Sequence, residues 1–200
     1  MIKVVRPRSP HPFASNTYIL SSGEECCIID PTVPYSGDLI KGKLKYIILT
    51  HCHFDHILEL DSWVNNTKAE LLVSPEAGKG LADPFVNCSA YFMSSAKGYF
   101  GQYSEIHDGD EMFLGNDKMK IVSCPGHTAG SISIICENMA FVGDTVFAGG
   151  GYGRCDLPGG DSDKLTDSIN KILSLPEDTV LYCGHGPQTT VKEFSLAYKS

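Results

Sequence analysis

The sequence concentrates metal-binding side chains in one short stretch, Thr50-His51-Cys52-His53-Phe54-Asp55-His56. Three imidazoles and one carboxylate fall within six residues, and these groups are common ligands of zinc and other transition metals. One such cluster does not complete a metal site, because a bound divalent metal needs about four donors and a frame of hydrogen bonds that orients them. Further ligands must therefore come from other parts of the chain.

Additional donors stand at the ends of strand-like runs. The first cluster itself follows Tyr46–Leu49, an apolar run that is typical of a buried strand. Three more potential ligands follow residues 119–122, 139–142 and 179–183, and they are His127, Asp144 and His185. Four strand ends thus deliver five His and two Asp. Because rigid strands hold the loops that follow them, this pattern predicts that the loops converge on a metal centre.

The order of these residues resembles the metallo-β-lactamase superfamily. The pattern His-x-His-x-Asp-His spans residues 51–56, and His127, Asp144 and His185 follow it in that order. A second pattern resembles a narrower group within it, the small glyoxalase II-like hydrolases. This pattern comprises Gly153-Arg154-x-Asp156, Gly159-Gly160-Asp161 and Gly184-His185-Gly186-Pro187. The resemblance covers nearly the whole chain. It implies an α/β fold, a four-layer αββα sandwich, with a two-metal site along one edge.

The resemblance also implies a role for each donor. One metal would be held by His51, His53 and His127, the other by Asp55, His56 and His185, and Asp144 would bridge them. Zinc suits this donor set best, although iron and manganese also accept it. Two such metals acidify a shared water, and the resulting hydroxide would attack a carbonyl. Asp55 and Asp144 are therefore the predicted catalytic carboxylates, and Asp55 would also orient the hydroxide.

The implied activity is hydrolysis of a thioester such as a hydroxyacylglutathione. A lactone hydrolase and a mononuclear iron persulfide dioxygenase are the alternatives. The Asp at position 144 disfavours a penicillin-degrading enzyme. We expect no C-terminal helical domain of the kind through which full-length glyoxalase II enzymes partly recognise glutathione. Arg154 and Tyr152, in a glycine-rich stretch, are predicted to bind substrate. For Arg154 the alternative is an ion pair with Asp156 or Asp161.

Composition predicts one cytoplasmic domain spanning residues 1–200. With 42% hydrophobic residues the chain has enough apolar side chains for a full core. No apolar run reaches membrane-spanning length, and the N-terminus lacks the apolar segment of a signal peptide. The formal charge of -8 argues against nucleic-acid binding. The resemblance implies a small-molecule thioester as the partner, and the oligomeric state stays open. The eight cysteines form no Cys-x-x-Cys motif and are expected to be reduced and mostly buried.

Hydrophobic periodicity predicts the elements that position the site. Strands are expected at 2–5, 17–21, 25–29, 46–49, 69–73, 111–114, 118–123, 131–136, 139–142 and 179–183, and helices at 38–42, 57–64 and 163–173. Asp55 is expected to cap or enter the second of these helices. By the period of two in extended chain, Cys52 should point away from His51 and His53. Residues 82–110 are rich in aromatics, which either form a flap over the metals or pack the segment onto the sheet. His11 and His107 are expected on surface turns.

Overall fold

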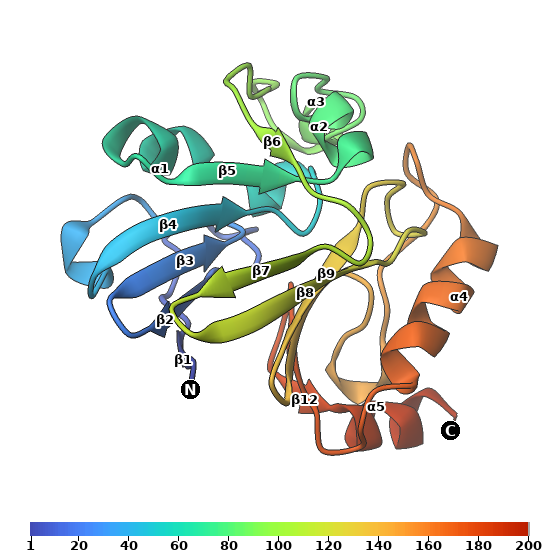
Figure 1. Ribbon diagram of the computed structural model, residues 1–200. Coiled ribbons are helices and arrows are strands. Elements are labelled where there is room, and N and C mark those ends of the chain that lie inside the picture. Colours follow the sequence, from blue (N-terminus) through green and yellow to red (C-terminus); the bar gives the residue numbers. More distant parts are fainter. Residues whose placement is uncertain (200) are drawn as a thin grey trace.

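The computed structural model describes residues 1–199 as two six-stranded sheets packed face to face, with helices on both outer faces (Figure 1). The first sheet has the strand order β1-β2-β3-β4-β5-β6, formed by Lys3–Val5, Tyr18–Ser22, Glu25–Ile29, Lys43–Ile48, Glu70–Val73 and Ser104–Glu105. The second has the order β12-β11-β10-β9-β8-β7, formed by β7 Glu111–Leu114, β8 Asp117–Ser123, β9 Ile132–Cys136, β10 Met139–Gly143, β11 Val180–Cys183 and β12 Thr189–Thr190.

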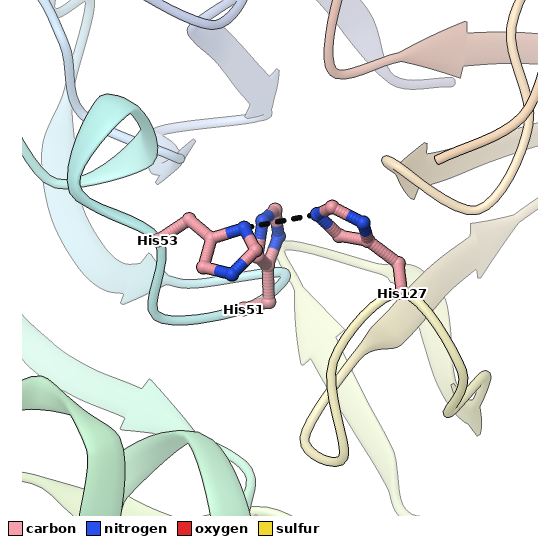
Figure 2. A group of neighbouring side chains, drawn as sticks. All are labelled: His51, His53 and His127. Atoms are coloured by element: carbon pink, nitrogen blue, oxygen red, sulfur yellow. Dashed lines mark hydrogen bonds between the residues drawn. The ribbon is translucent and has the colours of Figure 1, made fainter. Parts of the chain in front are cut away.

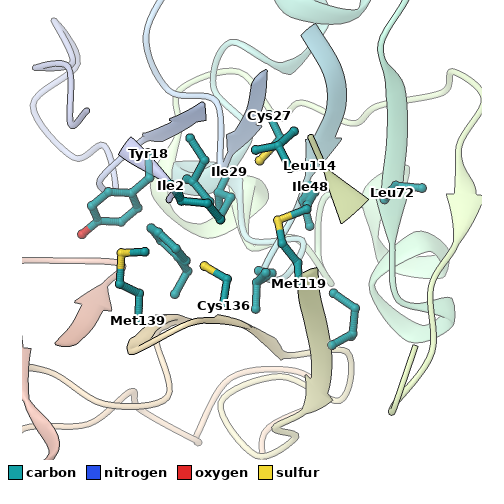
Figure 3. Packing of buried hydrophobic residues seen from close by; sticks show 14 of the residues in the cluster. Ile2, Tyr18, Cys27, Ile29, Ile48, Leu72, Leu114, Met119, Cys136 and Met139 are labelled. Atoms are coloured by element: carbon teal, nitrogen blue, oxygen red, sulfur yellow. The ribbon is translucent and has the colours of Figure 1, made fainter. Parts of the chain in front are cut away.

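Alternation along the strands explains the layers. Side chains of a strand point to opposite faces in turn, so a strand buried on both faces is apolar throughout. In β4, Ile48 faces the second sheet and Ile47 faces outward. In β5, Leu72 faces the second sheet and Leu71 faces outward. The inner cluster between the sheets, part of which Figure 3 shows, joins these residues to Met119, Ile134 and Phe141 of the second sheet, among others.

Five α-helices among the described residues cover the two outer faces. They are α1 Leu60–Asn66, α2 Pro75–Leu81, α3 Ser89–Phe92, α4 Ser162–Leu173 and α5 Val191–Tyr198. Trp63 of α1 and Leu81 of α2 pack on the first sheet, whereas Ile169 of α4 and Phe194 of α5 pack on the second. The N-terminus of α4 is capped by Asp161, whose carboxylate accepts hydrogen bonds from the backbone N–H groups of Asp163 and Lys164.

The direction of the strands decides where the loops meet. Strands β3, β4 and β5 are parallel, and so are β10 and β11. Strand β8 pairs antiparallel with β9, which pairs antiparallel with β10, so β8, β10 and β11 run the same way. The carboxyl ends of parallel strands lie at one edge of a sheet, where ligand sites commonly form. The loops after β4, β8, β10 and β11 therefore open at sheet edges.

The predicted α/β sandwich is confirmed, and all ten predicted strands are present within a few residues of their expected bounds. The prediction that a helix begins at residue 57 was wrong. A separate 3-10 turn, Phe54–His56, closes when His56 N–H and Ile57 N–H donate to the carbonyls of His53 and Phe54. Helix α1 then begins at Leu60, so Asp55 does not cap it.

Other elements depart from the periodicity as well. The helix expected at 38–42 is a single 3-10 turn, Gly37–Leu39. Helices α2 and α3 and strands β6 and β12 were not predicted, because each is too short to display a period. A further 3-10 turn, Ala148–Gly150, lies in the glycine-rich stretch before α4. No helix among the described residues has both the length and the apolar character needed to cross a membrane.

Candidate metal centre

The loops that follow four strands bring the seven predicted donors together. His51 and His53 come directly after β4, and Asp55 and His56 lie in the 3-10 turn that follows. The remaining three come from the second sheet: His127 follows β8, Asp144 follows β10 and His185 follows β11. The site therefore lies where the edges of the two sheets meet.

Two of the groups that the structure forms match the two predicted ligand sets. Figure 2 shows the first, in which the rings of His51, His53 and His127 converge, with His53 Nδ1 2.9 Å from His127 Nε2. The second comprises Asp55, His56 and His185, with Asp55 Oδ2 3.1 Å from His185 Nε2. Within each group, one potential ligand atom per residue lies within 4.8 Å of the others.

Asp144 lies between the two groups. Its Oδ2 is 3.6 Å from His127 Nε2 and also 3.6 Å from His185 Nε2. Its Oδ1 is 3.3 Å from His56 Nε2, and a third group of potential ligands combines Asp144 with His51 and His56. A single carboxylate thus reaches imidazoles of both groups, as a bridging ligand must.

The buried polar atoms of the site fit a metal. His51 Nε2, His53 Nε2, His56 Nε2 and Asp144 Oδ1 are all buried without a hydrogen-bond partner among the described residues. A buried polar atom without a partner costs about 1–3 kcal/mol, so such atoms are rare in folded proteins. Four of the six such side-chain atoms among the described residues belong to the predicted ligands. Closely spaced nitrogen and carboxylate donors suit divalent metals, and the residues present therefore fit a bound metal ion.

Hydrogen bonds behind the rings fix which nitrogen faces the centre. His56 Nδ1 lies 2.8 Å from Asp30 Oδ2, and because a carboxylate only accepts, Nδ1 carries the proton. Thr50 Oγ1 donates to the same carboxylate at 2.6 Å, so it accepts from His51 Nδ1 at 3.1 Å. His127 Nδ1 donates to the carbonyl oxygen of Arg154 at 2.6 Å. In all three rings, Nε2 is left to bind a metal.

Burial and neighbouring charges set the protonation of the donors. Burial, reinforced by neighbouring imidazoles, holds the pKa of His51 well below its usual range and lowers the pKa of His53 to about 3. These rings are neutral at pH 7, which is the form that binds metals. Burial would raise the pKa of Asp144, but the adjacent His56 outweighs it and holds that pKa below its usual value. Burial lowers the pKa of His56, but the carboxylates of Asp144 and Asp30 outweigh this effect and hold that pKa well above its usual value. Positive charge is therefore favoured beside Asp144.

A cleft of about 430 Å³ opens beside the ligands. Five of the seven predicted donors line it, namely His53, Asp55, His127, Asp144 and His185. The rest of its lining consists of Phe13, Phe54, Cys88, Phe92, Phe147, Gly153, Arg154 and Leu157. A cleft of this size accepts a small molecule and leaves it in contact with the metal ligands.

The family profile described as "Metallo-beta-lactamase superfamily" matches residues 11–185, which include every predicted ligand. This chain belongs to the metallo-β-lactamase superfamily. Among solved structures it is similar to the BLEG-1 B3 metallo-β-lactamase, with a TM-score of 0.85, 31% identity and coverage of 96% of this chain and 95% of that one. It is also similar to TTHA1623 in a di-iron-bound form, with a TM-score of 0.82, 26% identity and coverage of 96% and 98%.

Two curated relatives are about a third identical to this chain over the residues that align. The "Probable metallo-hydrolase YqgX" of Bacillus subtilis is 34% identical over 194 residues, which cover 90% of this chain and 89% of the relative. The "Hydroxyacylglutathione hydrolase GloC" of Haemophilus influenzae is 34% identical over 163 residues, which cover 74% of this chain and 72% of the relative. The superfamily and these relatives identify a metal-dependent hydrolase.

The two predicted substrate-binding residues differ in position. Arg154 lines the cleft, and it also forms the ion pair that was its alternative, with Nε 2.6 Å from Asp156 Oδ1 and Nη2 2.7 Å from Asp156 Oδ2. Tyr152 is not part of the cleft lining. Its ring lies against Tyr198 of α5, with 6.0 Å between ring centroids. A substrate role for Tyr152 stays a prediction, and its position gives that role no support.

The cysteines lie as their spacing in the sequence predicted, and the aromatic segment has residues in two environments. Each of the eight cysteines is a free thiol, and Cys52 is buried in the cluster under α1 and α2, away from the ligands as predicted. In the aromatic segment, Phe92 lines the cleft whereas Tyr99 is buried against the first sheet. Contact of this segment with substrate stays a prediction. Asn87 fastens the segment to the metal-binding loop by accepting a hydrogen bond from Phe54 N–H at 2.8 Å.

The two remaining histidines lie away from the ligands. His107 is exposed, as predicted. His11 is only partly exposed and lies 2.7 Å from the Glu59 carboxylate, so the surface turn holds it in a specific contact. Sequence reasoning did not single out Asp30. One signal was present: Asp30 directly follows a strand, as the ligands do.

Proposed function

We propose that this chain is a dinuclear metal-dependent hydrolase of thioesters. The observation that supports this most directly is the position of Asp144 between two groups of three ligands. A carboxylate in that position would hold two metals at a fixed spacing. Similarity to a protein solved in a di-iron-bound form also supports two metals, with zinc the first candidate and iron or manganese the others.

The residues of the chain would perform separate tasks in such a reaction. Metal ions held by the seven ligands would supply an acidified water and polarise a carbonyl oxygen. The carboxylates of Asp55 and Asp144 line the cleft, so they would accept hydrogen bonds from the attacking water and orient it. The cleft would hold the carbonyl group beside them, because it opens directly onto five of the ligands.

Thioesters are the substrate class that the relatives support. GloC is named a hydroxyacylglutathione hydrolase, and a hydroxyacylglutathione is a thioester. Lactones share the reactive carbonyl and form the second class to test. We also propose a cytoplasmic location, because eight free cysteines fit a reducing compartment.

The number of bound metals tests the dinuclear site. Zinc-loaded protein should contain two metal ions per chain by elemental analysis. Asp144→Ala should lower this ratio and reduce thioester hydrolysis by at least about a hundredfold, because the variant lacks the carboxylate shared by both groups. Asp167→Ala, an exposed substitution on α4, is the matched control and should change neither quantity. A ratio that stays near one with excess zinc would contradict the proposal.

An anaerobic assay separates the proposed hydrolase from a persulfide dioxygenase. Hydrolysis needs only water, so zinc-loaded protein should cleave lactoylglutathione or simpler thioesters without oxygen. A dioxygenase would instead require ferrous iron and consume oxygen with glutathione persulfide. A lactone and benzylpenicillin belong in the same panel, the latter because BLEG-1 is named a metallo-β-lactamase. Oxygen uptake without thioester cleavage would overturn the hydrolase assignment.

A further inference from the structure

Aromatic rings form much of the cleft beyond the ligands. Phe54 and Phe92 stack with their centroids 5.9 Å apart and their planes 21° from parallel. Phe92 belongs to α3 and is 52% exposed, and Phe13 of the N-terminal segment is 73% exposed. These exposed rings line one cleft together and adjoin predicted metal ligands, and apolar groups gathered in this way mark a binding site.

The stretch between β10 and α4 supplies a second apolar surface. Phe147 lies against the predicted ligand His185, with ring centroids 6.1 Å apart, and Leu157 also lines the cleft. Both apolar surfaces therefore approach the ligands, one from the Phe54–Phe92 side and the other from the Phe147–Leu157 side. A carbonyl beside the ligands would place its substituents among these side chains.

The cleft offers little to an anionic substrate. Among the described residues that line it, Arg154 is the one charged side chain that is not a predicted ligand. Two of its nitrogens already bond both oxygens of Asp156. Hydrogen bonding from Arg154 lowers the pKa of Asp156 to about 2, so this carboxylate is ionised at neutral pH. A substrate carboxylate would have to compete with it for the guanidinium.

We propose that the cleft selects thioesters with an apolar, ring-sized acyl group and a thiol that carries no net negative charge. Water would add across the C–S bond of such a substrate and release a carboxylic acid and the neutral thiol. This inference rests on the proposed thioester hydrolysis, and it narrows that function by naming the two groups joined at the carbonyl. Burying a phenyl ring against the stacked Phe54 and Phe92 supplies the selectivity for the acyl group, and the Arg154–Asp156 pair occupies the counter-ion that an anionic thiol would need.

Binding of thioethers tests the inference without requiring catalysis. Calorimetry of the zinc-loaded protein would compare S-phenethyl-N-acetylcysteamine, S-ethyl-N-acetylcysteamine and S-phenethylglutathione. The phenethyl cysteamine should bind at least about tenfold more tightly than the ethyl analogue, since burial of a ring is worth more than one factor of ten. It should also bind several-fold more tightly than the glutathione conjugate. Equal or tighter binding of either comparison ligand would overturn the inference.

Two variants assign the selectivity to named residues. Phe92→Ala should weaken binding of the phenethyl cysteamine by about fivefold or more, whereas Phe100→Ala, which removes a ring that is 83% exposed outside the cleft, should leave it unchanged. Asp156→Asn should raise the affinity for S-phenethylglutathione relative to the neutral ligand by about threefold or more, because the substitution frees Arg154. An unchanged ratio in Asp156→Asn, or equal effects of the two Phe substitutions, would contradict the assignment.

Failure of this inference and failure of the proposed function look different. If the ligands bind in the expected order but zinc-loaded protein cleaves no thioester, the cleft is as inferred and the hydrolase assignment falls. If thioesters are cleaved but glutathione thioesters are preferred over neutral aromatic ones, the hydrolase assignment stands and the inferred selectivity falls.

Discussion

Asp30 shows how a residue that is not a predicted ligand can position several that are. Its carboxylate accepts hydrogen bonds from Thr50 N–H at 2.8 Å and Thr50 Oγ1 at 2.6 Å, and it lies 2.8 Å from His56 Nδ1. Thr50 in turn contacts His51. A single buried carboxylate thus sets the orientation of one ligand from each group. Such partners usually change metal affinity by about 10–100-fold.

The substitution Asp30→Asn tests this role. Asparagine keeps the size but has one acceptor oxygen and one donor nitrogen, so it cannot accept all three hydrogen bonds. We expect zinc affinity to fall by about 10–100-fold, measured by competition with a chromophoric chelator. Asp38→Asn makes the same change of charge at an exposed position and should leave the affinity unaltered. Equal affinities of the two variants would show that Asp30 does not position the ligands.

At the scale of elements, the stretch between β10 and α4 is fitted closely against the ligands. A Cβ added at Gly153 would meet the carbonyl oxygen of Asp144 and would lie 2.8 Å from His127 Cγ. The adjacent Arg154 carbonyl accepts the hydrogen bond from His127 Nδ1. Glycine at position 153 therefore allows this backbone to approach the metal centre, which explains one part of the glycine-rich pattern.

Comparison of two alanine substitutions tests that close approach. Gly153→Ala should displace the segment from His127, lower the free energy of unfolding by about 1–3 kcal/mol and reduce metal content. Gly151→Ala is the matched control, because its Cβ would meet Phe147 at an ordinary 3.6 Å. Urea unfolding with elemental analysis would measure both effects. A Gly153→Ala protein with full metal content would refute this explanation of the glycine.

At the scale of the whole molecule, the metal centre joins the two sheets. Four predicted ligands follow β4 of the first sheet, and three follow strands of the second. The sheets also share the inner hydrophobic cluster, which packs them together independently of the predicted ligands. Metals bound by both sheets would add to that contact and stabilise the folded chain.

Metal removal should therefore lower the stability of the whole chain. A free zinc concentration a hundredfold above Kd stabilises a folded protein by about 2.7 kcal/mol, less whatever binding the unfolded chain retains. We expect a higher Tm for zinc-loaded than for chelator-treated protein in scanning calorimetry. Asp144→Ala should show a smaller difference between the two conditions. Identical Tm values with and without zinc would mean that the site does not couple the sheets.

The sequence motifs and the resemblance that they carry predicted the layered fold, and they selected seven candidate ligands that the fold brings together. Their role as metal ligands stays a prediction. The donors follow apolar runs with strand periodicity, and a strand places whatever follows it at a sheet edge, so His51, His127 and Asp144 were recognisable one at a time. The start of α1 was not predictable in this way. It depends on hydrogen bonds that close a separate turn at Phe54–His56, and this turn is also bonded to the distant Asn87 through Phe54 N–H.

Tertiary structure alone decided the rest of the site. Asp30 contacts His56 across twenty-six positions of sequence, and Phe13 joins Phe147 in one cleft although no local pattern relates them. The pairing of Arg154 with Asp156 rather than Asp161 was likewise settled by geometry. Local spacing encodes periodicity and strand ends, because these depend on near neighbours. Contacts between distant segments depend on how the two sheets pack. The proposed selectivity for substrate therefore follows from the folded cleft and not from the local sequence.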